Sequence, residues 1–443
     1  MWEHKLFAHG PQEIVGQALS LAGAVIVTLT LQLCSSQFIL SSYRWLRLLH
    51  LNGRADLPNT SPSGSSNERI QQLLEASYLM YTQYYPTDAI AILRCAYLIA
   101  AAAIVLVAIS PPLRDRFLSY GARTSETPLS SAEKEKQALQ SKQKKPSRTI
   151  LTSLLDELQQ WQVPHDWFWT FYALSVTLSA FWPGEAMFLH GPVYGLIRDS
   201  AGPLATSMTF EQLKVTWVML LVQGGRRLYE SLIFVEWEEF GTDKIMSKMW
   251  GGHWAMGLAF YIATSVAFWI EGIPAIEAHK LSYRDVIFNR PTMRTIFSVL
   301  LFILASGFQH DCHSYLAYLK RQPATDKSSS SDDSPATSSL TKSSSSPTSP
   351  EIFTQGDTTY KLPTHPAFQP IISPHYTAEV FIYLALALVS APQGAWINGT
   401  MSCAMVFVAV NLGVTAEGTR RWYARRFGAE AVKGKWRMVP GVW

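Results

Sequence analysis

Ionisable side chains recur at helical spacing inside residues 211–236, an apolar stretch long enough to cross a membrane. Gln223, Arg226 and Glu230 follow one another at steps of three and four, so they share one face of a helix. A bare charge at the bilayer centre costs about 2.5–3.5 kcal/mol on insertion scales. We therefore expect this face to meet a polar cavity or other protein; an Arg226–Glu230 pair that merely locks helices together is the alternative.

A second polar face lies near the end of the apolar stretch 294–319. Gln309, His313 and Lys320 recur at steps of four and seven, again on one side of a helix. Lys320 is expected at the cytosolic mouth of the bundle, where its ammonium group suits a phosphate as a point charge. The two polar faces are expected to converge on one hydrated pocket inside the bundle.

The same segment carries two histidines that permit a metal interpretation. His310 and His313 are three residues apart, with Asp311 and Cys312 between them. A membrane di-iron oxidase needs several such clusters to supply its ligands, whereas the other histidines of this chain are dispersed. The sequence therefore predicts no metal site.

A third group of hydrogen-bonding residues, Ser373, His375, Tyr376 and Glu379, opens another apolar stretch. Free backbone N–H groups and the helix dipole attract anions at such a helix start. Plain N-capping by Ser373, with Pro374 at the first helical position, explains the same local sequence equally well.

The composition of the 443-residue chain indicates a membrane protein. Hydrophobic residues make up 48% and charged residues only 16%, against about 25% charged in typical soluble proteins. The net charge of +4 is small and argues against a nucleic-acid partner. We predict an all-α, polytopic transmembrane bundle of about seven to eight spans. The candidate spans are about 14–40, 89–110, 166–184, 211–236, 251–271, 294–319, 377–391 and 397–416.

Charged and low-complexity segments predict how this bundle is organised. Basic residues concentrate in the segment 111–164 and in the C-terminal tail, which places both in the cytosol. The loop at 272–293 should then be lumenal, although it carries three basic residues. Ser, Thr and Pro dominate 323–360, which predicts a disordered cytosolic insert. We divide the chain into an anchor helix with a lumenal loop, 1–88, and a membrane domain, 89–443.

Six segments, in their order and spacing, resemble the steroid 5α-reductase superfamily and most closely its polyprenol reductase branch. The resemblance runs from about residue 89 to 443 and leaves the helix at 14–40 and the Ser-rich insert as additions. The segments are YGART at 120–124, VPHDWFWTFY at 163–172, QGGRRLYESL at 223–232, QHDCHSYLAYLK at 309–320, SPHYTAE at 373–379, and WYARRF through VPGVW at the end.

This resemblance implies a multi-pass endoplasmic-reticulum enzyme, with a cytosolic C-terminus, that uses NADPH. Neither GxGxxG after a strand nor GxxxxGK[ST] occurs, so the dinucleotide must bind to the helical bundle and its cytosolic loops. By position, the resemblance assigns cofactor binding to Gln309, His313, Lys320, Ser373, His375, Tyr376, Glu379, Thr419, Arg420 and Tyr423, and we predict the same role for Arg226 of the first polar face.

The resemblance also assigns the reaction centre. Gln223 stands where steroid reductases have a substrate-polarising Tyr, and Phe171 where they have a Glu. Both departures disfavour a steroid substrate and leave the proton donor unassigned. Tyr172, Tyr229 and Glu230 are the nearby candidates for that role.

The implied substrate is a long-chain isoprenoid lipid, reduced at its α-isoprene double bond in dolichol synthesis for protein N-glycosylation. An allylic alcohol is not activated for hydride addition, whereas an α,β-unsaturated aldehyde is, so we expect polyprenal to be the species reduced. A trans-2-enoyl thioester reductase and a steroid Δ4 reductase are alternatives within the superfamily. A methyltransferase acting on prenylated cysteine and a transporter or scaffold without chemistry are alternatives outside it. The oligomeric state stays open.

Overall fold

The helices of this protein form from long runs of Leu, Ile, Val, Ala and Phe. Polar or Gly/Pro-containing segments separate one run from the next. The computed structural model describes residues 89–118, 150–189, 191–198, 201, 207–234, 248–280, 282–321, 352–355 and 358–442. The predicted helix at 14–40, the YGART segment and most of the Ser-rich insert lie outside the described residues.

Helices dominate the described chain. They are α3 (Ala89–Ile109), α4 (Pro111–Phe117), α6 (Ile150–Gln160), α7 (Trp169–Pro183), α8 (Pro192–Arg198), α9 (Phe210–Phe234), α10 (Gly251–Glu277), α11 (Met293–Arg321), α12 (Pro374–Val389) and α13 (Gly399–Phe427). Antiparallel strand pairs lie outside the long helices of the described chain. They are β1 (Gln162–Pro164) with β2 (Lys248–Trp250), and β3 (Ile352–Gln355) with β4 (Thr358–Lys361).

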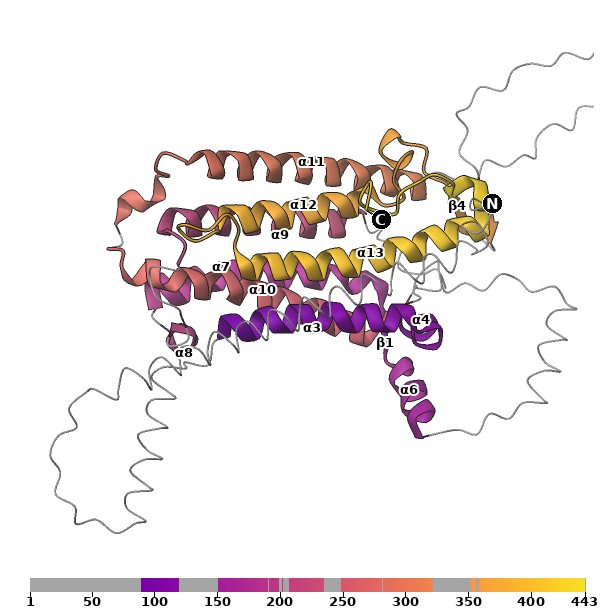
Figure 1. The fold of residues 1–443 in the computed structure, drawn as a ribbon, viewed down its shortest axis with the longest axis horizontal. Coiled ribbons are helices and arrows are strands. Elements are labelled where there is room, and N and C mark those ends of the chain that lie inside the picture. The colour runs from indigo at the N-terminus through magenta and orange to yellow at the C-terminus, as the bar shows by residue number, and fades with distance from the viewer. Residues whose placement is uncertain are drawn as a thin grey trace, which may run out of the picture.

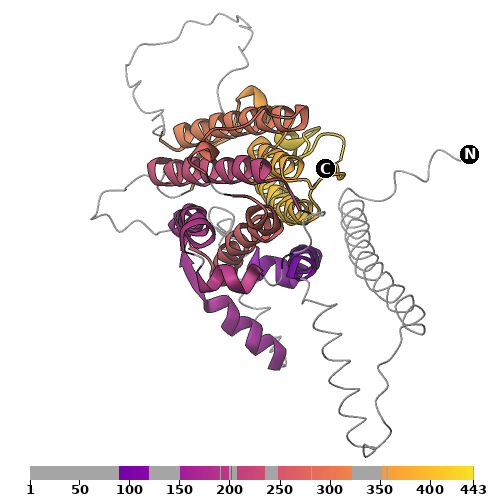
Figure 2. The same cartoon turned by 90° about the vertical axis from the view of Figure 1, so that its left-hand side faces the viewer.

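The long helices run roughly along one direction as a bundle (Figure 1), which Figure 2 shows nearly end-on. Helix α12 packs between α11 and α13, α13 packs on α3, and α7 packs on α9 and α10. Buried aromatic and aliphatic side chains fill the interior, with the rings of Phe260 and Phe407 stacked at 5.1 Å between centroids. The start of α12 and the ends of α9, α11 and α13 therefore lie at the same end of the bundle.

Four of the described helices are long and apolar enough to cross a membrane: α3, α10, α11 up to Lys320, and α13. Helices α7 and α12 are apolar but have only 15 and 16 residues. Helix α9 has 25 residues but carries charges near its start and in its second half. The result is consistent with a polytopic helical membrane protein, whereas the predicted seven to eight spans are not confirmed.

A buried polar cluster joins three helices away from the start of α12. The carboxylate of Glu271 in α10 accepts hydrogen bonds from Asn398 Nδ2, from Thr400 Oγ1 and, at 3.3 Å, from Arg94 Nη2. The Asn398 side chain is 0% exposed, and its Oδ1 also accepts from the Met401 amide at 2.9 Å, which caps α13. The Asn-Gly-Thr sequence at 398–400 is therefore part of the helix cap and not an accessible glycan acceptor.

Replacing Asn398 by alanine should lower the free energy of unfolding by about 1–3 kcal/mol, since the helix cap is lost and buried Glu271 loses a donor. Thermal unfolding of the purified protein in detergent measures this change. Asn411→Ala is the matched control, because its side chain, in the same helix, contacts no hydrogen-bond partner among the described residues. Equal melting temperatures for the two variants would contradict the capping role.

Candidate active site

The carboxylate of Glu230, 1% exposed in the last turns of α9, stands at the centre of a charged cluster. Arg226 and Arg227 each form an ion pair with one of its oxygens. From α11, the Nδ1 atoms of His310 and His313 both lie 2.8 Å from its oxygens. The polar faces of α9 and α11 thus face one another.

Two glutamines extend this cluster to α12. Arg226 donates to Gln309 and, at 2.8 Å, to Gln223 Oε1. The amide nitrogens of both glutamines donate to the same oxygen of Glu379, at 3.3 Å in the case of Gln223. Three helices are therefore joined by one continuous network of amide, guanidinium and carboxylate groups.

Helix α7 supplies an aromatic hydroxyl to the same network. Arg227 Nη2 donates to the Tyr172 hydroxyl at 2.8 Å, and the guanidinium carbon lies 4.8 Å from the centroid of that ring. The close approach of α7 to α9 depends on Gly224, since a Cβ at this position would lie 3.0 Å from Ser175 Oγ. A larger residue there would push the two helices apart.

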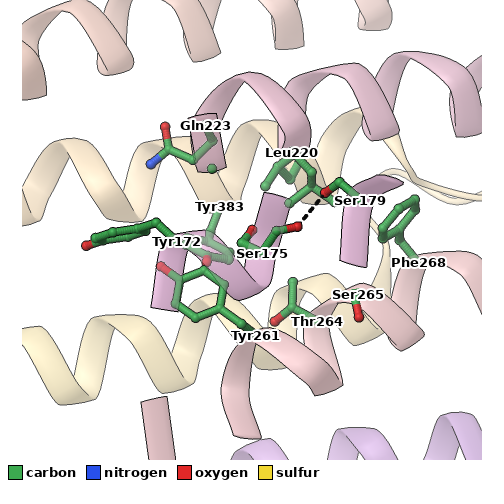
Figure 3. Close-up of a pocket in the computed structure, with 12 residues that line it drawn as sticks. Tyr172, Ser175, Ser179, Leu220, Gln223, Tyr261, Thr264, Ser265, Phe268 and Tyr383 are labelled. Atoms are coloured by element: carbon green, nitrogen blue, oxygen red, sulfur yellow. Dashed lines mark hydrogen bonds between the residues drawn. The ribbon is translucent and has the colours of Figure 1, made fainter. Parts of the chain in front are cut away.

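Next to this network lies a small cavity between α7, α9, α10 and α12 (Figure 3). Its volume is about 20 Å³, room for one water-sized group. Its wall is formed by Tyr172, Ser175, Ser179, Leu220, Gln223, Gly224, Tyr261, Thr264, Ser265, Phe268, Tyr383 and Leu386. Gln223 and Tyr172 thus contact both the charged network and the cavity.

Three buried nitrogens of the predicted cofactor-binding residues have no hydrogen-bond partner within the described chain. They are Arg226 Nε, His375 Nδ1 and Arg420 Nε. Buried polar atoms are normally paired, so unpaired ones at a candidate site point to a ligand that supplies the missing partners. A dinucleotide, with its phosphate oxygens, hydroxyls and amide, has the acceptors and donors that these atoms lack. The residues present therefore fit NADPH.

The predicted cofactor segment at the start of α12 is held by the chain's C-terminal end. The amide N–H groups of Ile372 and Ser373 donate to the carbonyls of Trp436 and Arg437, at 2.8 and 3.1 Å. Ser373 is the N-cap residue and Pro374 follows at the first helical position, but the Ser373 side chain makes no capping bond. The N-capping alternative therefore holds for the position of Pro374 but not for the Ser373 side chain.

Two aromatic side chains of this segment pack beside the network. The His375 ring lies 4.2 Å from that of Tyr376 and 5.3 Å from that of His313, between ring centroids. His375 also contributes its carbonyl, which accepts from Gln309 Nε2 at 3.3 Å. The segment thus contacts the α11 face directly.

The predicted residues of α13 lie at the same end of the bundle. Thr419 Oγ1 donates to the Thr415 carbonyl at 3.1 Å, and the ring of Tyr423 lies 5.4 Å from that of Trp422. Arg420 is half-buried. In this arrangement α13 can border the site only through its last turns.

The structure does not bring Tyr229 and Lys320 into the network. Tyr229 is 58% exposed, because each helical residue turns about 100° and the position before Glu230 faces outward. Lys320 is exposed near the end of α11, about 10 Å along the helix beyond His313. Tyr229 is thus poorly placed to serve as the proton donor.

Four residues of the site are missing from the sequence-based assignment: Arg227, His310, Tyr261 and Tyr383. Arg227 could have been predicted, because it adjoins Arg226 in an apolar stretch and either arginine could face the site. The sequence suggests His310 only as a metal ligand, yet its ring contacts Glu230. Tyr261 and Tyr383 lie in apolar helices among other aromatic residues, where nothing in the sequence separates them from core side chains.

The spacing of His310 and His313 is the basis of the metal alternative. Both rings turn Nδ1 toward Glu230, whose oxygens are also paired with two arginines. Within the part of the chain that the structure covers, no group of three or more His, Cys, Asp or Glu residues is arranged to hold a metal ion.

Comparison with known proteins bears on the C-terminal part of this site. Residues 337–443, which include α12 and α13, match the family model described as 3-oxo-5-alpha-steroid 4-dehydrogenase. An uncharacterized protein of Schizosaccharomyces pombe is 23% identical over 287 residues, which are 63% of this chain and 78% of that relative. The match is confined to this segment, which is therefore similar to a family of oxidoreductases.

Proposed function

We propose that this protein is an NADPH-dependent reductase of the endoplasmic-reticulum membrane that saturates the α-isoprene double bond of a polyprenal. The reaction would serve dolichol synthesis and protein N-glycosylation. The observation that carries the proposal is the network that joins Gln223, Gln309 and Glu379 from three helices, in which Gln223 also lines a cavity inside the bundle. The match of residues 337–443 to a reductase family agrees with it.

The cofactor would be held at the end of the bundle where α12 begins. Arg226, His375 and Arg420 offer nitrogens without partners in the described chain, and Ser373, Tyr376, Thr419 and Tyr423 lie on the same segments of α12 and α13. Bound NADPH supplies a hydride. Lys320, exposed near the end of α11, can reach a phosphate that extends toward the cytosol.

Glu230 acts in this proposal by positioning other groups rather than by donating a proton. Both of its oxygens are already bound by arginines and histidines, which stabilise its ionised form. Its carboxylate fixes Arg226, and Arg226 in turn fixes Gln223 and Gln309. This leaves Gln223 and Tyr172 as the predicted catalytic residues that also line the cavity.

The membrane location suits a long isoprenoid. Large apolar side chains on the outer face of α11 are exposed, among them Phe297, Leu300, Ile303 and Leu304. Such a surface is compatible with lipid, so the isoprenoid tail can remain in the bilayer while its oxygen-bearing end enters the bundle. Gln223 would then lie near the oxygen, where negative charge develops as the β-carbon accepts the hydride.

The decisive experiment offers the purified protein and NADPH either polyprenal or polyprenol, without another oxidoreductase. We expect NADPH oxidation and a saturated α-isoprene unit with the aldehyde only, because conjugation with the carbonyl activates the double bond. Mass spectrometry of the lipid product measures the outcome. Equal turnover of the alcohol would refute the aldehyde as substrate.

A second pair of substrates tests the superfamily alternatives. A trans-2-enoyl thioester and a Δ4 steroid undergo the same conjugate reduction, so faster turnover of either would replace the isoprenoid proposal. In cells that lack the protein, we expect α-unsaturated polyprenols to accumulate and dolichol to fall. An unchanged isoprenoid profile would count against the proposed pathway.

A further inference from the structure

Two tyrosine hydroxyls at the cavity have no hydrogen-bond partner in the described part of the chain. Tyr383 of α12 is only 3% exposed, and Tyr261 of α10 is mostly enclosed. Both side chains line the cavity. In Figure 3 they gather around it from two helices together with Tyr172 and Gln223.

Several neighbouring hydroxyls already have hydrogen-bond partners within the chain. Tyr172 already accepts a bond from Arg227, Thr264 pairs with Tyr97 at 3.0 Å, and Ser179 donates to the Ser175 carbonyl. Ser265 donates to the Ile262 carbonyl. Tyr261 and Tyr383 are thus the phenols beside this space of about 20 Å³ for which the described chain offers neither a donor nor an acceptor.

A buried tyrosine hydroxyl normally finds a hydrogen-bond partner. Here the partner must come from whatever enters the cavity, and a space of this size accepts one oxygen-sized group. A phenol is a donor to a carbonyl oxygen, whose lone pairs are acceptors only. Two phenol donors beside one small space therefore suit a carbonyl or enolate oxygen.

We propose that the hydroxyls of Tyr261 and Tyr383 form the site that receives the carbonyl oxygen of the unsaturated substrate. The proposal rests on the reductase function proposed above and specifies which groups bind the oxygen. Gln223 borders the same cavity, but its amide nitrogen is directed to Glu379 and its amide oxygen to Arg226. The hydroxyls of Tyr261 and Tyr383, which have no partner among the described residues, are then available to the substrate.

The reaction balances with this assignment. The β-carbon gains a hydride from the dihydronicotinamide, the π electrons of the C=C bond form a new bond between the α-carbon and the carbonyl carbon, and the C=O π electrons move to oxygen. Tyr261 and Tyr383 donate hydrogen bonds to that oxygen as its negative charge grows. A proton from solvent water then bonds to the α-carbon and the C=O bond re-forms, which gives the saturated aldehyde and the oxidised cofactor.

The test uses Tyr261→Phe and Tyr383→Phe in the purified full-length protein. Phenylalanine keeps the ring packing, and neither change removes a hydrogen bond within the described chain, so both variants should fold. Loss of one such donor lowers kcat about 100- to 1,000-fold in comparable sites, and we expect a fall of that order with little change in KM. Tyr194→Phe is the matched control, since that buried hydroxyl bonds Glu277 away from the cavity and its loss should leave kcat unchanged.

A second readout does not depend on turnover. The C10 isoprenoid enal citral, labelled with ¹³C at its carbonyl, is bound without NADPH, and its carbonyl stretching frequency is measured by infrared difference spectroscopy. Hydrogen bonds from two phenols should shift the band to lower frequency. Each Phe variant should lose part of that shift, whereas Tyr194→Phe should keep it.

The outcomes separate the two proposals. A tyrosine-dependent shift without any NADPH oxidation would support the oxygen site and refute the reductase. Reduction of the enal with kcat and shift unchanged in both Phe variants would overturn the oxygen site and leave the reductase standing. A wild-type band at the frequency of the free enal would also overturn the oxygen site.

Discussion

Replacing Glu230 by alanine is expected to lower the free energy of unfolding by about 3–5 kcal/mol, the cost of removing one partner from a buried ion pair. The reason is specific to this carboxylate: it is 1% exposed and pairs with two arginines, which would otherwise face each other in a medium of low dielectric constant. Thermal unfolding in detergent measures the effect. A loss of this size is a large fraction of the stability of a typical domain, so we also expect poor accumulation of the variant.

Two further variants test whether burial and charge pairing cause this loss. Glu430→Ala removes an 82%-exposed carboxylate whose partner is the surface residue Lys433, and should change stability by less than about 1 kcal/mol. Arg227→Met combined with Glu230→Leu removes one cation together with the carboxylate and should recover part of the loss. A Glu230→Ala protein as stable as Glu430→Ala would mean that the cluster does not hold α9 to α11.

The helical period explains why much of this cluster is predictable from the sequence. Residues three and four apart share a face, so spacing alone places Gln223 with Glu230 and Gln309 with His313. The cost of burying charge in lipid then predicts that these faces turn toward protein, and they do. Both arguments use only local spacing and the membrane environment.

Other features depend on long-range packing that local patterns do not encode. Tyr229 has suitable chemistry for a proton donor, but its position on the helix turns it outward. Tyr261 and Tyr383 differ from core aromatics only through the cavity beside them, which four helices create together. The span count is not confirmed for a simpler reason: α7 and α12 are short, and α9 is too charged, to qualify by length and composition.

The two halves of α9 carry different kinds of side chain. In its first half the buried side chains are apolar or neutral polar, whereas the second half presents Gln223 and Glu230 to the network. Gly224, which follows Gln223, lies where α9 meets α7, and small residues at helix contacts let backbones approach closely. The cavity therefore depends on one glycine that faces α7.

Replacing Gly224 by leucine should reduce the reductase activity to background. A Cβ at this position lies 3.0 Å from Ser175 Oγ and 3.3 Å from Val176 Cγ2, and Gly224 also lines the cavity. A leucine side chain must therefore enter the cavity or separate α7 from α9, and such overpacking costs about 1–3 kcal/mol as well. NADPH oxidation with polyprenal and thermal unfolding measure the two effects.

Gly225→Leu is the matched control, because a Cβ at Gly225 meets nothing within 4 Å. The same substitution one residue later should keep activity, and it should raise the helix propensity by about 0.5–1 kcal/mol because glycine is a poor helix former. The neighbouring positions thus receive identical chemistry and differ only in the face they occupy. If both variants lost activity equally, flexibility of the glycine pair rather than the cavity would explain the effect. If both stayed active, the substrate oxygen would not enter between α7 and α9.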